Sequence, residues 1–427
     1  MIKVMRYGEI SNEEIFSREM IQNQVEKPVA EIIQNVRSRG DAALREYSSR
    51  FDGAEISKFE LCQTEIEAAA QCVDADLLRI LKTAAENIRN FHQRQLRQGL
   101  IINEKEGVIT GQKLTPIERV GLYVPGGTAA YPSTVLMNAI PAKIAGCKEI
   151  VMVTPPQKDG SINPAILAAA AVAGVDRIFK IGGAQAIAAL AYGTESVPRV
   201  DKIVGPGNAF VAEAKKQVFG QVAIDMIAGP SEILIVADKN ANARFIAADL
   251  LSQAEHDRMA SAVLVTDSAE LCEKVKNELE YQLSLLSREK IARASIDTNG
   301  KIILVDSIEQ AIDISNTIAP EHLELCVERP FDYLNSVRNA GSIFLGYYCP
   351  EAAGDYFAGP NHTLPTGGTA RFSSPLSVDD FVKKTQYTYY TEKAFSAVAR
   401  DIARFAETEG LNAHAKSAMI RLEEGQK

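Results

Sequence analysis

The sequence predicts an α/β protein with parallel sheets flanked by helices. Short apolar segments that end in Gly and Pro begin at Arg119 and alternate with Ala-rich helical stretches, as in parallel sheets covered by helices. A strand, helix and strand unit at residues 121–156 has a coarse echo at residues 232–267, which indicates two related α/β units. Helical patterns occupy most of the first hundred residues and the C-terminal tail, so we expect helices at both ends.

Length and composition predict a folded protein of several domains. At roughly 150 residues per domain, a chain of 427 residues suggests two or three units. The hydrophobic fraction of 46% and the charged fraction of 24% are typical of globular proteins. The net charge of −9, without a basic stripe, argues against a nucleic-acid partner. The N-terminus is charged and the longest apolar run, residues 164–175, is too short to span a bilayer, so we expect no membrane association and a cytoplasmic location.

Local signals predict the individual elements in chain order. Ser11 and Glu14 have the spacing of a capping box, and helical periodicity resumes over residues 29–47. Four strand ends follow in the middle of the chain: GLYVPGG, EIVMVTPP, RIFKIGG and DKIVGPG. Ligands of open α/β sheets bind outside the carboxyl ends of strands, so we expect these ends to line a site. After Phe372 the pattern is helical again, in VDDFVKK and in residues 392–424.

The cysteines carry no predicted chemistry. They are scattered without CxxC spacing, which suits small buried hydrophobic residues better than disulfides or a thiolate metal site. The six are Cys62, Cys72, Cys147, Cys272, Cys326 and Cys349.

Five histidines occur, and their surroundings differ. His92 lies in a polar helical stretch, where we expect a solvated surface residue. Gln253 and His256 lie three residues apart at a predicted helix end, so both can reach one metal ion from one helix face. The alternative is an ordinary polar helix end, in which a protonated His256 complements the helix dipole.

A second histidine follows a proline and a glutamate. If Pro320 is the first residue of a helix, Glu321 and His322 lie in its electropositive first turn. Imidazole and carboxylate then form a plausible acid/base pair, with His322 taking a proton and Glu321 activating water. The alternative is a helix start with a favourably placed acidic residue.

Two further segments contain candidate site residues. Asp355 and His362 lie among small residues in a stretch rich in Gly, Pro, Asn and Thr, which is typical of a loop that lines a site, although a surface loop would look similar. Glu409 and His414 lie near the C-terminus in what could be a polar helix.

The glycine motifs point to no familiar nucleotide site. GPGNAF resembles half of a dinucleotide fingerprint, but Phe210 stands where a third glycine would allow close helix packing. The sequence contains no GxxxxGK[ST], HExxH or GxSxG motif, which argues against P-loop, zincin and α/β-hydrolase chemistry.

Taken together, seven motifs resemble one family over nearly the whole chain. In order they are RVGLYVPGGTAAYPSTVLMNAIPAKIAG, KIGGAQAIAALAYGT, VDKIVGPGNAFVAEAKKQVFG, IDMIAGPSEILIVAD, DLLSQAEHD, IAPEHLEL and AGPNHTLPTGGTARF. They closely resemble the histidinol dehydrogenase family. The resemblance implies two incomplete Rossmann-like units that bind NAD without the usual fingerprint, a small mainly helical C-terminal domain and an N-terminal helical arm.

The resemblance also implies roles for individual residues. The implied zinc ligands are Gln253, His256, Asp355 and His414, the last coming from the partner subunit of a homodimer. The implied substrate contacts are Ser231, Gln253, His256, His322, Asp355, Glu409 and His414. The implied NAD contacts are Tyr123, Gln185 and Asn208, and the two general bases are Glu321 and His322. Such nitrogen and oxygen ligands suit zinc but would also accept manganese or cobalt.

The implied domain division is discontinuous. Residues 1–21 form the N-terminal arm. Residues 22–121 and 230–375 form one Rossmann-like domain, which carries the metal and base residues. Residues 122–229 form the second, with the NAD contacts, and residues 376–427 form a C-terminal helical domain that reaches the partner subunit.

The implied activity is a four-electron oxidation of L-histidinol to L-histidine through a retained aldehyde, with two NAD⁺. Three other interpretations stay open. One is an aldehyde dehydrogenase relative that uses Cys326 or Cys349 as a nucleophile. Another is a zinc hydrolase in which Glu321 activates water. The third is a dinucleotide-binding or metal-sensing protein without catalysis.

Overall fold

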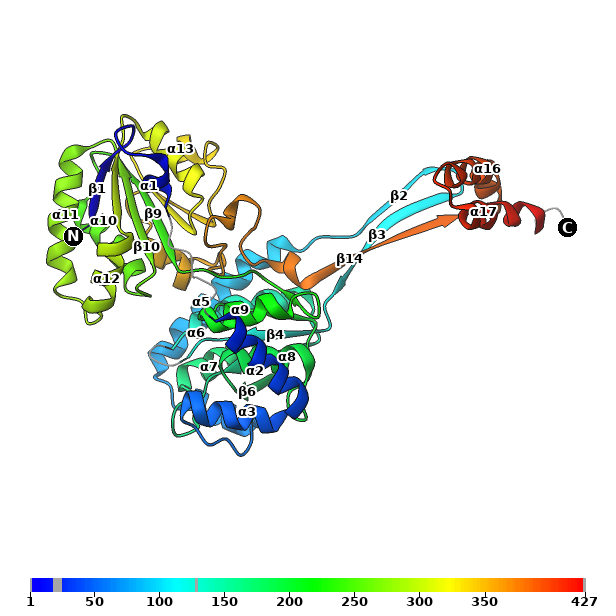
Figure 1. Ribbon diagram of the computed structural model, residues 1–427, viewed down its shortest axis with the longest axis horizontal. Helices are drawn as coiled ribbons and strands as arrows, with labels where there is room; N and C mark the ends of the chain where they lie inside the picture. The colour runs from blue at the N-terminus through cyan, green and yellow to red at the C-terminus, as the bar shows by residue number, and fades with distance from the viewer. Residues whose placement is uncertain (1, 18–24, 127–129, 425–427) are drawn as a thin grey trace. The chain divides into compact units, whose positions relative to one another are not determined.

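The computed structural model describes residues 2–17, 25–126 and 130–424. The chain divides into two compact units. The first comprises Met1–Gln95 and Ile117–Phe381, and the second comprises Leu96–Pro116 and Val382–Lys427. Both sheets of the first unit are parallel and flanked by helices, which confirms the predicted fold class (Figure 1).

One sheet of the first unit has five parallel strands in the order β6-β5-β4-β7-β8. The strands are β4 (Arg119–Tyr123), β5 (Glu149–Thr154), β6 (Arg177–Lys180), β7 (Lys202–Val204) and β8 (Ala223–Ile224). The helices between them are α6 (Pro132–Ala145), α7 (Pro164–Ala173), α8 (Gly183–Tyr192) and α9 (Ala209–Val218). The chain builds outward from β4 to β6 and then returns to β7, so β4 and β7 flank the point where the strand order reverses, a usual ligand position.

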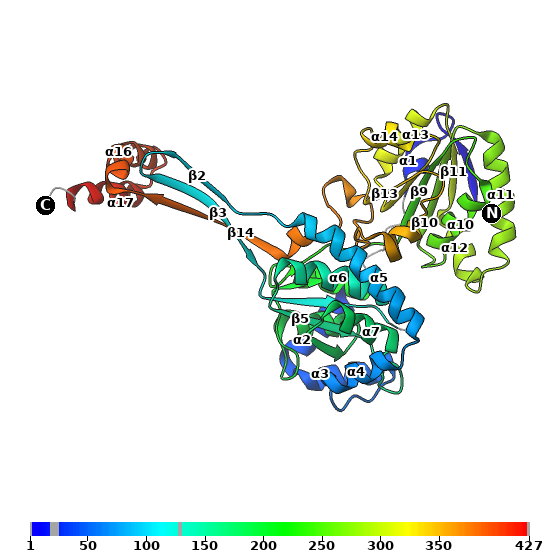
Figure 2. The same ribbon diagram turned by 180° about the vertical axis from the view of Figure 1, so that it is seen from behind.

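The N-terminal helices pack against this sheet's own helices. They are α2 (Glu26–Arg39), α3 (Asp41–Tyr47), the π-helix η1 (Ser48–Asp52), α4 (Gln63–Gln71) and α5 (Ala75–His92), with a 3-10 turn η2 (Gln93–Gln95) after them. Helix α2 lies beside α8 and α9 (Figure 1), while α5 lies beside α6 and α4 beside α7 (Figure 2). The expected division, which groups residues 22–121 with the metal and base residues, differs from this packing. The apolar faces of α2 and α3 are buried in the core of the five-stranded sheet, in one cluster that includes Val29, Leu44 and Phe179.

The other sheet has six parallel strands in the order β1-β11-β10-β9-β12-β13. They are β1 (Lys3–Arg6), β9 (Glu232–Ala237), β10 (Ser261–Thr266), β11 (Lys301–Leu304), β12 (His322–Cys326) and β13 (Ser342–Leu345). The associated helices are α1 (Asn12–Phe16), α10 (Ala243–Ala254), α11 (Ala269–Leu283), α12 (Glu289–Asn299), α13 (Ile308–Ile318), α14 (Pro330–Leu334) and α15 (Glu351–Ala353). Alternate side chains of β9 enter two cores: Ile233 and Ile235 pack on one face, Leu234 and Val236 on the other.

The N-terminal arm is partly different from the expectation. Ser11 caps α1 by accepting a hydrogen bond from the backbone NH of Glu14, as its spacing predicted. Residues Lys3–Arg6, however, form a strand that pairs with β11, so this segment belongs to the six-stranded sheet. Residues 1 and 18–21 of the predicted arm lie outside the described residues.

The second unit contains a three-stranded antiparallel sheet and two helices. The strands are β2 (Leu100–Lys105), β3 (Val108–Pro116) and β14 (Val382–Tyr390), and the helices are α16 (Glu392–Thr408) and α17 (Asn412–Glu424). The short 3-10 turns η4 (Thr369–Arg371) and η5 (Val378–Phe381) lead up to β14. The helical prediction for VDDFVKK, residues 378–384, is wrong from Val382 onward, where β14 begins. Thr and Tyr favour strands, and β14 pairs with β3 along its full length, a long-range contact that overrides the local pattern.

A buried ion pair fixes the loop after β7. Lys215 is paired with Asp225, and both side chains are almost fully buried. The Lys215 ammonium also donates to the carbonyl oxygen of Gly205 at 2.9 Å, and Asp225 accepts from the Gly205 NH at 2.7 Å. Gly205 has φ of +113°, and a Cβ there would lie 2.1 Å from the carbonyl oxygen of Tyr123, so only glycine fits.

Removing one partner of this pair should cost much stability. We expect Asp225→Ala to lower the free energy of unfolding by about 3–5 kcal/mol, because Lys215 would remain buried without its counter-charge. Urea unfolding followed by circular dichroism measures this value. The matched control is Glu270→Ala, which removes an exposed, solvent-screened pair with Lys274 and should leave the free energy of unfolding nearly unchanged. Equal losses in the two variants would contradict the interpretation.

Candidate active site

Glu321 and His322 lie where α13 gives way to β12. Helix α13 ends at Ile318, and Ala319 caps it with φ of +51°, the only positive φ of a non-glycine among the described residues. Pro320 thus follows a helix end, a frequent position for proline, and His322 is the first residue of β12. The predicted helix start at Pro320 is therefore wrong, and the pair lies at the amino-terminal edge of the six-stranded sheet.

Backbone and side-chain contacts hold this pair. The Glu321 carboxylate accepts a hydrogen bond from the backbone NH of Glu232 at 2.9 Å. His322 Nδ1 lies 3.0 Å from the carbonyl oxygen of Glu232 and 2.8 Å from Gln253 Nε2. This leaves Nε2 facing Asp355 Oδ1 at 3.5 Å, and no described residue gives it a hydrogen bond. The imidazole also stacks on Phe344, with ring centroids 6.0 Å apart, so its orientation is fixed.

Burial and clustered carboxylates shift the proton affinities of both groups. Burial raises the pKa of Glu321 to about 8, against the opposing charge of His322. Burial alone would lower the pKa of His322, but the carboxylates of Glu321, Asp355 and Glu351 outweigh it and raise this pKa to about 10. Negative charge thus holds a proton on His322, and positive charge brought to Asp355 would help to release it.

Gln253 and His256 come from the end of α10, as predicted. Gln253 lies in the last turn of α10, and His256 follows the C-cap residue Glu255. Gln253 Nε2 donates to Glu351 Oε2 at 2.8 Å, which turns the nitrogen end of the amide toward Glu351 and leaves the carbonyl oxygen as the end available to a cation. Burial lowers the pKa of His256, so its imidazole is favoured in the neutral, metal-binding form.

Asp355 and His362 lie in one loop segment that includes the π-helix η3 (Gly354–Ala358). The pKa of Asp355 is lowered despite its burial, because His322, His362 and His256 surround the carboxylate. His362 Nδ1 lies 3.1 Å from the carbonyl oxygen of Asp355, and its own pKa is lowered by burial. The predicted site loop therefore does contribute a charged carboxylate to the same place as Gln253 and His256.

One cavity of about 1060 Å³ joins these side chains. Seven predicted site residues line it: Ser231, Gln253, His256, Glu321, His322 and Asp355, together with the predicted NAD contact Asn208. Glu409 and His414 belong to the second unit, where Glu409 caps α16 and His414 is an exposed residue of α17. The first unit of one chain therefore assembles three of the four predicted metal ligands.

The donor set fits an incomplete metal site. Gln253, His256 and Asp355 supply an amide oxygen, a neutral imidazole and an ionised carboxylate, a mixture that zinc accepts. Within the described residues, no group of three or more His, Cys, Asp or Glu side chains is arranged to hold a metal ion.

The position of this site differs from the general expectation for α/β sheets. His322 pairs with Ile233 near the start of β9 and with Ser342 at the start of β13. The acid/base residues thus lie at the amino ends of these strands, whereas the Gly-rich carboxyl ends were expected to line a site. The Gly-rich strand ends named in that expectation belong to the five-stranded sheet.

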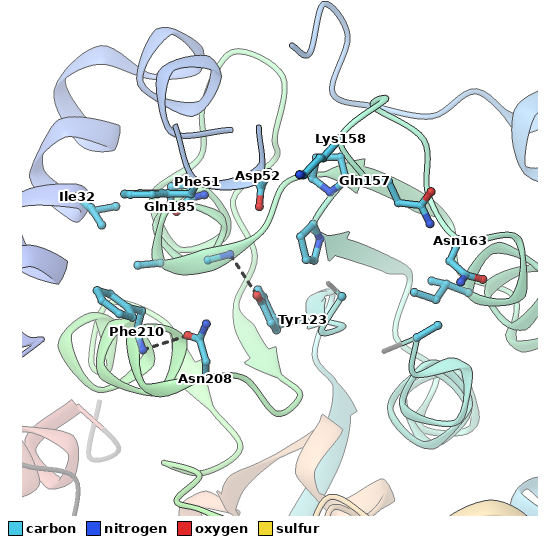
Figure 3. Close-up of a pocket in the computed structure, with 17 residues that line it drawn as sticks. Ile32, Phe51, Asp52, Tyr123, Gln157, Lys158, Asn163, Gln185, Asn208 and Phe210 are labelled. Carbon is cyan, nitrogen blue, oxygen red and sulfur yellow. Dashed lines mark hydrogen bonds between the residues drawn. The ribbon is translucent and has the colours of Figure 1, made fainter. Parts of the chain in front are cut away.

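A second cavity of about 730 Å³ lies at the carboxyl ends of β4 and β7 (Figure 3). It brings together the three predicted NAD contacts Tyr123, Gln185 and Asn208. Tyr123 accepts a hydrogen bond from the Gly183 NH at 3.1 Å. Gln185 is 1% exposed, and neither atom of its amide finds a hydrogen-bond partner in the described part of the chain. A buried amide without partners is costly, which indicates a ligand that satisfies it.

The glycine loop before α9 explains why GPGNAF matches only half of a dinucleotide-binding fingerprint. Asn208 caps α9 by accepting hydrogen bonds from the NH groups of Phe210 and Val211. Figure 3 draws the bond from Phe210. These two NH groups are the ones that would bind a pyrophosphate in a complete dinucleotide motif. Phe210 lines the cavity with its ring. A dinucleotide here must therefore be bound without the usual helix N-terminus.

The structure bears on the predictions for His92 and for two of the cysteines. His92 is fully buried, with Nδ1 2.8 Å from Gln95 Oε1, so the prediction of a surface residue is wrong. His92 lies on the buried face of α5. Its neighbours in the sequence are polar, so the local pattern did not indicate this burial. Cys326 is buried, and burial together with Glu324 raises its thiol pKa, while Cys349 is half-buried. A raised pKa disfavours the thiolate that an aldehyde dehydrogenase mechanism needs.

Sequence reasoning missed two residues at these cavities. Glu351 orients Gln253 and accepts a hydrogen bond from Ser252 at 2.6 Å. Asp52 lines the second cavity from η1. Neither has a local signal beyond being a charged residue, because each acquires its neighbours only through tertiary packing.

The fold and the two cavities define an α/β protein with a buried acid/base site beside a cofactor-sized cavity. Comparisons with known proteins identify its family. The family model described as histidinol dehydrogenase matches residues 16–422. The chain is 55% identical to histidinol dehydrogenase of Clostridium acetobutylicum, with 99% of both chains covered, and 58% identical to that of Syntrophotalea carbinolica over 94% of this chain and 93% of the relative. The crystal structure of histidinol dehydrogenase from Elizabethkingia anophelis superimposes with a TM-score of 0.94 at 40% identity, covering 100% of this chain and 99% of that one.

The chain belongs to the histidinol dehydrogenase family, which is a family of oxidoreductases. The predicted resemblance is thereby confirmed. Among the helices of the described residues, none is long and apolar enough to cross a membrane.

Proposed function

We propose that this protein oxidises L-histidinol to L-histidine through L-histidinaldehyde, with two NAD⁺ and one zinc ion per subunit, in the last steps of histidine biosynthesis. The observation that carries the proposal is the pair of adjoining cavities. One gathers an acid/base pair and three metal ligands, the other gathers the NAD contacts, and Gly126 and Asn208 line both. A nicotinamide near Asn208 would thus adjoin the substrate.

The two oxidations use the same acid/base pair. In the first, His322 accepts the alcohol proton as the carbinol hydride passes to NAD⁺, which gives the aldehyde and NADH. In the second, Glu321 accepts a proton from water as it adds to the aldehyde, and His322 returns the proton it took from the alcohol to the aldehyde oxygen, which gives the hydrate. The hydrate then gives its hydride to a second NAD⁺ and a proton to His322. The sum consumes one water and two NAD⁺ per histidinol.

Binding residues keep the substrate and the aldehyde in place. Gln253, His256 and Asp355, with His414 of the partner subunit, would hold zinc, which would supply a positive charge that helps to position the substrate. Ser231 and Glu409 would complete the substrate contacts. A homodimer follows from this arrangement, since one chain supplies the ligands from its first unit and the other supplies those from its second.

The decisive experiment counts NADH. Zinc-loaded protein with limiting L-histidinol and excess NAD⁺ should form two NADH per histidinol, followed by absorbance. Chelator-treated protein should form none, and added zinc should restore the reaction. A single NADH per histidinol would show that oxidation stops at the aldehyde, and product without NADH would favour the zinc hydrolase.

A further inference from the structure

The cavity proposed for NAD contains one acidic side chain that no role described above explains. Among the described residues that line it, Asp52 is the only acidic one and Lys158 the only basic one. Asp52 ends the π-helix η1, and Gly53 follows in the left-handed conformation. In Figure 3 its carboxylate points into the cavity, and Tyr123 lies between it and Asn208.

The shared lining of the two cavities sets the direction of a bound dinucleotide. Gly126 and Asn208 line both cavities, so the hydride-accepting nicotinamide must lie at that end. The adenosine half then extends past Tyr123 toward the part of the cavity where Asp52 and Lys158 lie. Asp52 is thus placed to meet the adenosine half rather than the reacting ring.

The carboxylate of Asp52 requires hydrogen-bond donors. Its Oδ2 is buried, and no residue that the structure describes gives it a hydrogen bond. Burial raises the pKa of Asp52 to about 6, so the group is still mostly ionised at neutral pH. An ionised carboxylate only accepts hydrogen bonds. The vicinal hydroxyls of a ribose offer two donors, whereas a 2′-phosphate offers none and adds a like charge.

We propose that Asp52 accepts hydrogen bonds from the 2′- and 3′-hydroxyls of the adenosine ribose and thereby selects NAD over NADP. The inference rests on the proposed function of this cavity. Lys158 remains nearby as a cation, so removal of the Asp52 charge should make a 2′-phosphate more acceptable.

The test compares Asp52→Asn with the wild-type protein on NAD⁺, NADP⁺ and the hypoxanthine analogue of NAD⁺, which lacks the adenine amino group. We expect KM for NAD⁺ to rise about 10–100-fold with kcat nearly unchanged, because a charged hydrogen bond to the ribose is weakened. The efficiency with NADP⁺ should stay equal or rise. The hypoxanthine analogue should lose the same factor as NAD⁺.

The control variant is Asp159→Asn, which removes a nearby exposed carboxylate that does not line the cavity and should change neither dinucleotide. Misfolding is not expected to obscure the result. Since the folded pKa of Asp52 is raised, its protonated form stabilises the fold below about pH 4 and this contribution is lost as pH rises through about 6. A neutral Asn should therefore keep or raise the urea midpoint at neutral pH.

Direct titration of NADH and NADPH by fluorescence separates this inference from the proposed function. If the wild-type protein binds neither dinucleotide, the proposed function fails. If it binds NADH but Asp52→Asn weakens NADH and NADPH by equal factors, the ribose assignment is overturned. A loss that disappears with the hypoxanthine analogue would assign Asp52 to the adenine amino group instead, and would also overturn it.

Discussion

Replacing His322 with Asn is expected to lower kcat by about 10²–10⁴-fold for both the alcohol and the aldehyde oxidation. The substitution removes the proton acceptor of both hydride transfers, whose free Nε2 faces the cavity beside Asp355. His322 is not among the proposed metal ligands, so the zinc content should stay near one per subunit. Single-turnover kinetics with L-histidinol and with L-histidinaldehyde, together with metal analysis, measure these effects.

Two further variants test the separate roles of the acid/base pair. Glu321→Gln should lower aldehyde oxidation more than alcohol oxidation, because only the second half-reaction needs activated water. His92→Asn, which replaces another buried imidazole, serves as the control and should leave both rates within a few-fold of wild type. Equal losses in both half-reactions for Glu321→Gln would argue against this division of labour, and loss of zinc from His322→Asn would argue against its role as a base.

Mixing two inactive proteins is expected to restore activity if subunits share the site. A His256→Ala subunit keeps its own His414, and a His414→Ala subunit keeps its own His256. Each heterodimer would then contain one site with every ligand intact. With equal amounts and free subunit exchange, about half of the dimers are mixed, so about a quarter of the wild-type activity should return.

The matched control for this experiment uses two variants of the same unit. His256→Ala mixed with Asp355→Ala should give no rescue, because both residues line the cavity of a single chain and no heterodimer has an intact site. Exchange is followed with differently tagged subunits. If exchange is complete and the first mixture stays inactive, His414 does not act across a dimer.

Local sequence patterns predicted most of the secondary structure. The Ser11 cap and the strands β4 to β7 depend on neighbouring residues, and short-range rules therefore apply to them. The resemblance carried by seven motifs supplied the family. It also named Tyr123, Gln185 and Asn208, which the structure brings to one cavity.

Long-range packing explains where prediction failed. His92 looks solvated in sequence, but its helix face is covered by other elements. The strand β14 forms only because β3, about 270 residues earlier in the chain, offers it a paired edge. The helix start assigned to Pro320 became a strand start because β12 inserts between β9 and β13, which outweighs the local preference.

The sequence by itself determined the fold class, the family and the residue types of the site, because alternation, turn residues and motif order are local properties of the chain. Only the tertiary structure decided that His322 lies between Gln253 and Asp355 at the amino edge of one sheet, and that Glu351 orients the Gln253 amide. It also left the carboxylate of Asp52 without a partner in the other cavity. These contacts join residues about 30 to 100 positions apart, whose proximity depends on how whole sheets and helices pack.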